Sequence, residues 1–279
     1  MKWLVLTIIL IVLGFIYRKS KILFAVQMIW MWILTGFNTM GIDFKTNESI
    51  YNYSTNKITF GDGFANVLSF IMKQHDVTFI TYNVITTFVA YLILYIIIRK
   101  KTSCGAMVAS FMMLYPFPDF VIQKRFFLAM VIVFVAIQYS DFRKKKNIIL
   151  YIILVIIAFQ FHSSTLFYIL PLLFFLIPDK YKTKILVLLS AIAVVMVKYI
   201  PNIVKKIGMF SSGKIELYFN ELAKESSLYK FAFWIIFQLI CISFVWYAKK
   251  KNIFKESETI NLMFEKTYNM NIELLCVLP

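Results

Sequence analysis

Long apolar runs alternate with short polar segments along almost the whole chain. Nine runs stand out, at residues 3–17, 22–37, 77–98, 103–117, 126–140, 148–161, 165–177, 184–200 and 229–248. A helix needs about 20 predominantly apolar residues to cross a hydrocarbon core of about 30 Å, and several of these runs are somewhat shorter. The pattern predicts an all-α, polytopic integral membrane protein with about nine transmembrane helices.

Basic clusters fall after every second predicted crossing. They lie at residues 18–21, 99–101, 143–146, 180–184 and 249–255. Lys and Arg accumulate in cytoplasmic loops, so this alternation places the clusters in the cytoplasm and the N-terminus outside.

The same topology places two long segments, 38–63 and 201–228, at the outer face of the membrane. The run 64–71 that follows the first is too short to cross and predicts an interfacial or re-entrant helix. The second loop mixes lysines with glutamates, and we keep two interpretations: a solvated loop, or a lid that contacts an anionic ligand. We treat 1–279 as one membrane domain in which 249–279 is a cytoplasmic tail. Its last residues begin an apolar run, as expected of a truncated further span.

Composition agrees with a membrane protein. The chain is 61% hydrophobic and 16% charged, with a mean hydropathy of +0.76, whereas globular domains are about 45–50% apolar and about 25% charged. The net charge of +16 sits in the short clusters, so it indicates topology rather than nucleic-acid binding. Neither the three cysteines nor the two histidines have ligand spacing, and we expect no metal and no cofactor.

His162 lies in the middle of the apolar stretch 147–177, which has basic residues on both sides. An unbroken helix of that length would measure about 46 Å, so the stretch predicts a hairpin whose tip carries His162. Each arm is short, and the tip should sit in a recess open to the outside. Two hypotheses stay open: the Ser163–Thr165 segment caps the next helix and His162 is a turn residue, or His162 is a hydrogen-bond donor or general base.

Charged residues gather in the outward turn 116–125, which carries Asp119, Lys124 and Arg125. A helix N-terminus with an Arg and a Lys suits a phosphate group, and the alternative is that both cations snorkel to lipid head groups. Asp43, after Gly41, is either a turn or cap residue or an acceptor that orients a hydroxyl group.

Four motifs in this order resemble the EpsG family, a branch of the Wzy-type membrane polysaccharide polymerases. They are Gly41-Ile42-Asp43 with Tyr51 or Tyr53, Gly63-Phe64, Arg125 with Ala129, and Phe161-His162-Ser163-Ser164. Their order and spacing agree over about residues 20–180, and beyond residue 200 only the hydropathy is similar.

The resemblance implies a metal-independent glycosyltransferase at the outer face of the bacterial cytoplasmic membrane. It would transfer a glycan from undecaprenyl diphosphate to a sugar hydroxyl of a lipid-linked repeat unit, in capsule, O-antigen or exopolysaccharide synthesis. Arg125 and Lys124 would bind the departing diphosphate, and His162 and Asp43 would activate the acceptor. Candidates for acceptor binding are Asp119, Asp62, Tyr51 and Tyr53. Expected partners are membrane lipid, and a chain-length regulator and flippase of the same pathway.

Other functions remain open on the sequence. A flippase or transporter of lipid-linked glycan would share the many spans, but charges along a pathway within the spans would be expected, and the runs here are largely apolar. A glycan ligase shares the leaving group of the polymerase. A membrane acyltransferase would be expected to carry a His-Asp pair, or an intramembrane histidine beside an acyl channel, and His162 alone does not decide this. If later spans complete the family site, a truncated chain would be inactive.

Overall fold

The structure, a computed structural model, describes residues 2–40, 43–58, 61, 63–178 and the single positions 180, 181, 184, 185, 188, 236 and 243. Every regular element in this part of the chain is helical, which confirms the all-α prediction there. The predictions for 184–200, 201–228, 229–248 and 249–279 lie outside the described residues, apart from single positions. The chain divides into two compact units, Met1–Tyr168 and Ile169–Pro279. The candidate residues all belong to the first.

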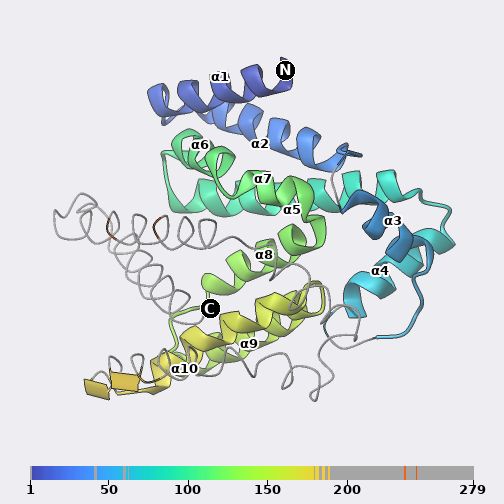
Figure 1. Ribbon diagram of the computed structural model, residues 1–279. Helices are drawn as coiled ribbons and strands as arrows, with labels where there is room; N and C mark the ends of the chain where they lie inside the picture. Colours follow the sequence, from blue (N-terminus) through green and yellow to red (C-terminus); the bar gives the residue numbers. More distant parts are fainter. Residues whose placement is uncertain are drawn as a thin grey trace. The chain divides into compact units, whose positions relative to one another are not determined.

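The predicted apolar runs correspond to helices whose ends differ from the prediction by a few residues. Figure 1 labels them as α1 (Lys2–Ile16), α2 (Lys21–Gly36), α5 (Phe79–Lys101), α6 (Gly105–Leu114), α8 (Lys124–Ile137) and α9 (Lys145–Phe159). Among the described residues, α5 alone is long and apolar enough to cross a membrane by itself. The total of nine spans therefore stays a prediction.

The segments predicted as outward loops contain helices that the hydropathy pattern did not predict. Helix α3 (Phe44–Asn52) lies within 38–63, and α7 (Phe117–Ile122) lies within 116–125. Helix α3 is polar and rich in weak helix formers, and its fold depends on Phe44 and Tyr51, which pack against Phe79. Helix α7 begins with Pro118 in its first turn, where the fixed φ of proline suits a helix.

Two further elements fall where short structures were expected. The run 64–71 lies in α4 (Gly63–Gln74), a helix of 12 residues. After α9 the chain makes a turn and continues as a 3₁₀ helix, η1 (Ser163–Ile169), and then as α10 (Leu170–Leu176). The break at 160–162 confirms that the stretch 147–177 is not one continuous helix.

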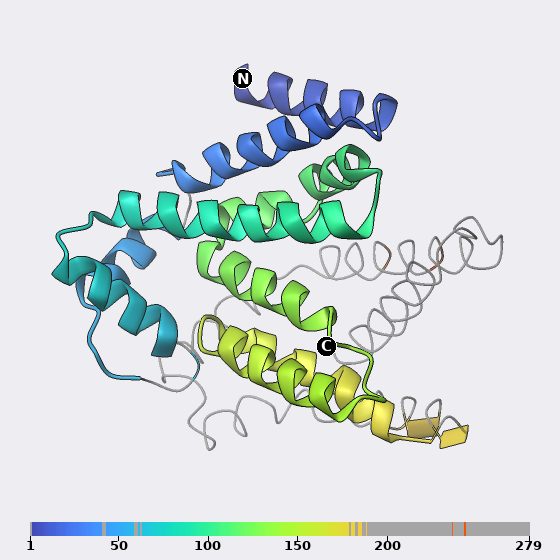
Figure 2. The ribbon, with the colours of Figure 1, turned by 180° about the vertical axis from the view of Figure 1, so that it is seen from behind.

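Helix α5 lies between α2 and α8 in the first unit. Helix α2 packs against α5, α1 and α6, while α8 packs against α5 and α9, and the two views of the ribbon show this order (Figures 1 and 2). Ring contacts such as Tyr91–Phe127, with centroids 4.7 Å apart, join α5 to α8.

A polar contact lies inside the α1–α2–α6 interface. Gln27 Nε2 donates to Leu10 O and to Ser110 Oγ, both at 2.9 Å, and Ser110 Oγ donates to Ile11 O. Gly14 provides the space for this contact, because a Cβ there would collide with the side chains of Ser110 and Gln27. Small residues that let helices approach closely, with polar groups bonded across the interface, are typical of helix packing in membranes.

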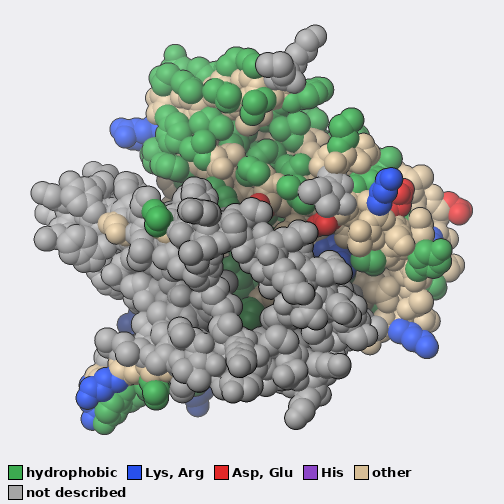
Figure 3. All heavy atoms as spheres, in the orientation of Figure 1, with side chains coloured by type: hydrophobic (Ala, Val, Ile, Leu, Met, Phe, Trp, Pro, Cys, Tyr) green, Lys and Arg blue, Asp and Glu red, His purple; other side chains and the backbone are tan. Residues whose placement is uncertain are grey.

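The outer surface of α1 is apolar over nearly its whole length. Figure 3 shows this green surface over α1 and α2, and its large exposed members on α1 are Trp3, Leu4, Val5, Leu6, Ile8, Ile9, Val12, Phe15 and Ile16. A continuous apolar face of this kind marks contact with a membrane or another protein. It agrees with the prediction that α1 faces lipid.

Candidate functional site

Helix α3 is fastened to the start of α5 by an aromatic cluster. Tyr51 is 3% exposed and packs against Phe79 and Tyr82, and its hydroxyl donates to Val77 O at 2.6 Å. Burial raises the pKa of the Tyr51 phenol. Tyr53, one residue past the end of α3, is 82% exposed. Of the two tyrosines predicted to bind an acceptor, Tyr51 therefore holds the scaffold together and Tyr53 is open to a ligand.

Asp43 occupies the position that precedes α3. Its main-chain oxygen accepts from Asn47 N at 2.9 Å, but its carboxylate makes no capping hydrogen bond. The side chain is half-buried. The cap hypothesis thus explains the backbone of Asp43 and leaves the carboxylate available for another role. Gly41, Ile42 and Asp62 lie outside the described residues.

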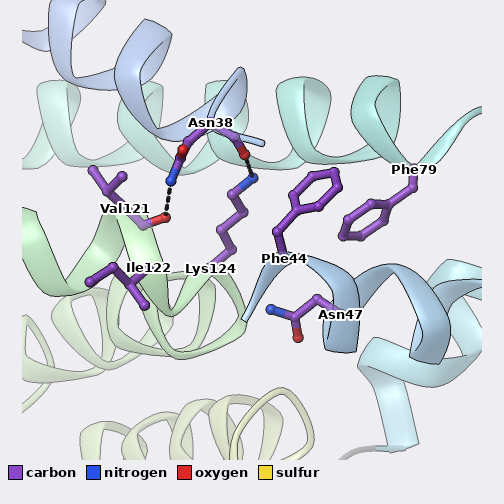
Figure 4. Close-up of a pocket in the computed structure, with 7 residues that line it drawn as sticks. All are labelled: Asn38, Phe44, Asn47, Phe79, Val121, Ile122 and Lys124. Carbon is purple, nitrogen blue, oxygen red and sulfur yellow. Dashed lines mark hydrogen bonds between the residues drawn. The ribbon is translucent and has the colours of Figure 1, made fainter. Parts of the chain in front are cut away.

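Lys124, the first residue of α8, points into the protein. Its Nζ donates to Asn38 O at 2.9 Å and lies 5.4 Å from the centre of the Phe44 ring, and the residue is only 6% exposed. Figure 4 shows the ammonium group inserted between these two residues, in a shallow pocket completed by Asn47, Phe79, Val121 and Ile122. Lys124 precedes the predicted span 126–140, and burial lowers its pKa to about 8. This lysine ties the segment after α2 to the start of α8.

Arg125 has different surroundings from its neighbour. It is half-buried, and its guanidinium lies within electrostatic reach of the Tyr82 hydroxyl on α5. Both cations were predicted to bind a diphosphate. The structure buries Lys124 against a main-chain carbonyl, so the diphosphate hypothesis now rests chiefly on Arg125.

Asp119 lies in the first turn of α7, on the same connection as the two cations. It is half-buried, and burial raises the pKa of its carboxyl group. Its main-chain oxygen accepts from Gln123 N at 2.7 Å, at the end of that helix. The short α7 thus carries Asp119 just before the start of α8, where Lys124 and Arg125 lie.

His162 forms the turn between α9 and η1. Its main-chain oxygen accepts from Thr165 N and Thr165 Oγ1, at 3.1 and 2.8 Å, and its Nδ1 lies 2.8 Å from Ser164 Oγ and accepts from Ser164 N at 3.4 Å. In these bonds His162 is the acceptor and Thr165 Oγ1 is a donor, which fits a turn residue bonded to its neighbours, whereas the cap hypothesis expects a hydroxyl of the Ser163–Thr165 segment to accept a main-chain N–H. Which of Nδ1 and Ser164 Oγ donates to the other depends on the tautomer of the imidazole ring.

Gln160, two residues before His162, was missed by the sequence analysis. Its side-chain Oε1 accepts from Gly63 N at 3.1 Å, and its main-chain oxygen accepts from Phe64 N and Ala65 N at 3.2 and 3.3 Å. The available signal was a polar residue directly before Phe161-His162, at the end of an apolar run. Its partners lie up to 97 residues away along the chain and could not be identified from the sequence.

Three contacts bring the separate motifs to one end of the first unit. The ring of His162 meets that of Phe126, next to Arg125; Lys124 meets Phe44, next to Asp43; and Gln160 holds Gly63-Phe64. In Figure 2 the starts of α3, α4 and α8 and the end of α9 lie toward the same side of the ribbon. Segments that are up to about 120 residues apart thus form one site region.

A comparison with protein-family models matches residues 21–278 to the EpsG family. The chain belongs to the EpsG family. The resemblance based on the four motifs is therefore confirmed, and the match continues well past residue 180, the end of the part in which their order and spacing agree. Membership makes this a membrane protein related to polysaccharide polymerases. Neither the curated proteins nor the solved structures gave a significant match to the chain.

Proposed function

We propose that this EpsG family member polymerises lipid-linked oligosaccharide repeat units at the outer face of the bacterial cytoplasmic membrane. The observation that carries the proposal is the convergence of the Asp43, Gly63, Arg125 and His162 segments at one end of the helix bundle. Such a region of cationic and polar groups, in a protein with apolar outer surfaces, suits a substrate that is part lipid and part sugar.

The reaction joins a sugar hydroxyl to the anomeric carbon of a glycan carried on undecaprenyl diphosphate. A C–O bond forms to the acceptor oxygen, the bond from the anomeric carbon to the phosphate oxygen breaks, and the diphosphate departs with the electron pair. Charge builds up on the departing phosphate oxygen, and a guanidinium can donate two parallel hydrogen bonds to it. Arg125 takes this role, and the chemistry needs no metal for it.

The roles of His162 and Asp43 depend on whether each side chain donates or accepts a proton. In the tautomer that carries its proton on Nε2, His162 is a hydrogen-bond donor and orients a substrate oxygen. The Asp43 carboxylate makes no hydrogen bond to cap α3. We assign it the role of accepting the proton of the attacking hydroxyl. Tyr53, Asp119 and Asp62 are candidates to contact the acceptor sugar, and Tyr51 supports them from the aromatic cluster.

Nine spans, the outward site and a multi-pass location in the cytoplasmic membrane belong to the same proposal. The exposed apolar face of α1 and the alternating basic clusters support it. A chain-length regulator and a flippase of the same pathway are the protein partners that such a polymerase would work beside.

The test is deletion of the gene, complementation with the wild-type gene, and gel analysis of surface glycan and of lipid-linked intermediates. We expect the deletion to lose long glycan and to accumulate single repeats that reagents outside the cell can reach. Single repeats that remain protected from such reagents would indicate a flippase instead. Long glycan that stays attached to the lipid carrier would indicate a ligase, and normal glycan that lacks an acyl group would indicate an acyltransferase.

A further inference from the structure

The N-terminus of α4 meets the turn that carries His162 through a single residue, Gln160. The first main-chain N–H groups of a helix have no partner within the helix and must find one elsewhere. Here three consecutive groups, of Gly63, Phe64 and Ala65, all donate to the oxygens of Gln160. One residue at the end of α9 therefore accepts hydrogen bonds from three of the first N–H groups of α4, which have no partner within that helix.

The two glycines beside this contact show how closely the segments approach. A Cβ on Gly63 would lie 2.6 Å from Gln160 Oε1 and would also press on Ile58. Gly61 has a positive φ of 91°, a conformation that glycine adopts readily, and a Cβ there would lie 3.4 Å from the Cβ of Ser163. The chain before α4 is thus packed on both Gln160 and the first residue after His162.

The other side of the His162 turn is bounded by α8. The Phe126 ring meets the imidazole edge to face, with centroids 5.3 Å apart and planes at 69°. Phe126 directly follows Arg125, so a shift of the turn would change the separation of the imidazole from that guanidinium. The turn is therefore held between the start of α8 and the start of α4, and Gln160 supplies the bonds on the α4 side.

We propose that Gln160 is a positioning residue: it fastens the His162 turn to α4 and so sets where the imidazole stands relative to Arg125. The role of the turn in catalysis rests on the proposed function. The attachment itself does not, because it follows from the hydrogen bonds and the two glycines.

The chemistry of this contact predicts which substitutions work. The Gln160 side chain serves as an acceptor at the positive end of a helix, so a carboxylate of the same length should replace it and interact favourably with the helix dipole. Leucine has a similar volume but no acceptor, and leaves Gly63 N without a partner. Gln160→Glu and Gln160→Leu are therefore a matched pair that separates hydrogen bonding from packing.

The experiment measures two properties of each variant in the deletion strain. The first is polymer length and yield, at equal amounts of protein in the membrane. The second is the rate at which an impermeant thiol reagent labels a cysteine placed at Ser163, in a protein whose native cysteines are serine, which reports on the turn regardless of any reaction. We expect Gln160→Leu to label several-fold faster and to lower polymer yield at least tenfold, and Gln160→Glu to match the parent in both.

The positioning role of Gln160 and the proposed reaction would be contradicted by different results. If Gln160→Leu labels and polymerises like the parent, or if Gln160→Glu is as defective as Gln160→Leu, the positioning role is wrong. If the labelling rates follow the prediction while Arg125→Ala still makes normal polymer, the attachment holds and the proposed reaction fails. Should Gln160→Leu be absent from the membrane, the milder Gln160→Asn keeps the amide but is one carbon shorter, and normal polymer from it at normal labelling would equally overturn the proposal.

Discussion

The rings of Phe126 and His162 meet edge to face with centroids 5.3 Å apart. This contact joins the start of α8 to the turn after α9, and it places Arg125 and His162 in neighbouring parts of one site region. Two motifs that the sequence suggested separately thus become two parts of one arrangement, and each can be tested with its own substitutions.

Arg125→Ala should abolish long glycan while lipid-linked single repeats accumulate. Removal of one donor to a developing oxyanion slows comparable reactions about 100- to 1,000-fold. Arg125→Lys should restore a part of the activity, because lysine keeps the charge but loses the bidentate geometry. Gel electrophoresis of surface glycan measures both.

The matched control for that experiment is Arg143→Ala. Arg143 is exposed and pairs with Asp141 at 3.0 Å, in the predicted cytoplasmic connection before α9, so its loss should leave chain length unchanged. Normal chain lengths in Arg125→Ala, with the protein stably inserted, would contradict the assignment of Arg125.

His162→Ala should reduce polymer without removing the protein from the membrane. The local turn keeps its bonds from Thr165 to the main-chain oxygen, while the side-chain contacts of His162 with Ser164 and with the Phe126 ring are lost. His162→Asn is the informative partner, because the asparagine oxygen can accept the Ser164 N–H but cannot replace Nε2 as a donor at the same place. Membrane yield and polymer length are measured together. A turn residue with no further role would show low yield in His162→Ala and recovery of both properties in His162→Asn.

Lys124 should make stability depend on pH in the alkaline range. Burial lowers its pKa in the folded protein to about 8, whereas a lysine in an unfolded chain titrates near ~10.4. Between these values the unfolded state binds more protons, so stability rises with pH, and below pH 8 the cost of burying the charge is fully present. Thermal unfolding in detergent at several pH values should show this rise in the parent.

The comparison for Lys124 is Lys124→Met, which keeps an unbranched apolar side chain and cannot titrate. Other lysines and tyrosines titrate in the same range, so the relevant quantity is the difference between the two proteins. The midpoint of thermal unfolding of the parent, relative to that of Lys124→Met, should therefore increase as the pH rises from 8 towards 10. An equal pH dependence in both would show that Lys124 is not buried as described.

Gly14→Ala should destabilise the packing of α1 against α2 and α6. The added methyl group would meet Ser110 and Gln27 and lie 2.7 Å from Ala106 O, and overpacking of this kind typically costs about 1–3 kcal/mol. Ile9→Ala on the exposed face of α1 is the control and should have a smaller effect. The midpoint of thermal unfolding in detergent measures both, and equal midpoints for the two variants would contradict the close approach at Gly14.

Cysteine labelling tests the predicted topology. With Cys104, Cys241 and Cys276 replaced by serine, a cysteine at Asp119 or His162 should react with an impermeant reagent added outside the cell. A cysteine at Lys144 should react only after the membrane is opened, because it lies in a basic cluster predicted to be cytoplasmic. Labelling of Lys144→Cys in intact cells would show that the predicted topology is inverted, and the proposed site would then not lie at the outer face.

Hydropathy was sufficient for the main helices and insufficient for the elements that build the site. Helices α2, α5 and α9 coincide with apolar runs because side-chain burial in lipid or core depends on local composition. Helices α3 and α7 have no such run. Helix α3 forms because Tyr51 and Phe44 pack against Phe79 at the start of α5, and Phe79 lies well outside α3 along the chain. The candidate residues Asp43 and Asp119 are both positioned by these short helices.

Residue type alone also could not show that the two cations at the start of α8 have different surroundings. Lys124 and Arg125 are adjacent and both suit a phosphate group, yet the main-chain carbonyl of Asn38 and the ring of Phe44 engage Lys124 inside the protein. Gln160 attracted no attention in the sequence, since glutamine has many uses and its partner Gly63 is far along the chain.

From the sequence we could infer that this chain is an α-helical membrane protein, locate the polar segments between its apolar runs, and find the family that its motifs resemble. Those properties follow from local composition and from the order of short motifs. The burial of Lys124, the contact of His162 with Phe126 and the attachment of α4 to Gln160 required the folded structure, because each depends on which atoms meet after segments up to 97 residues apart have packed together.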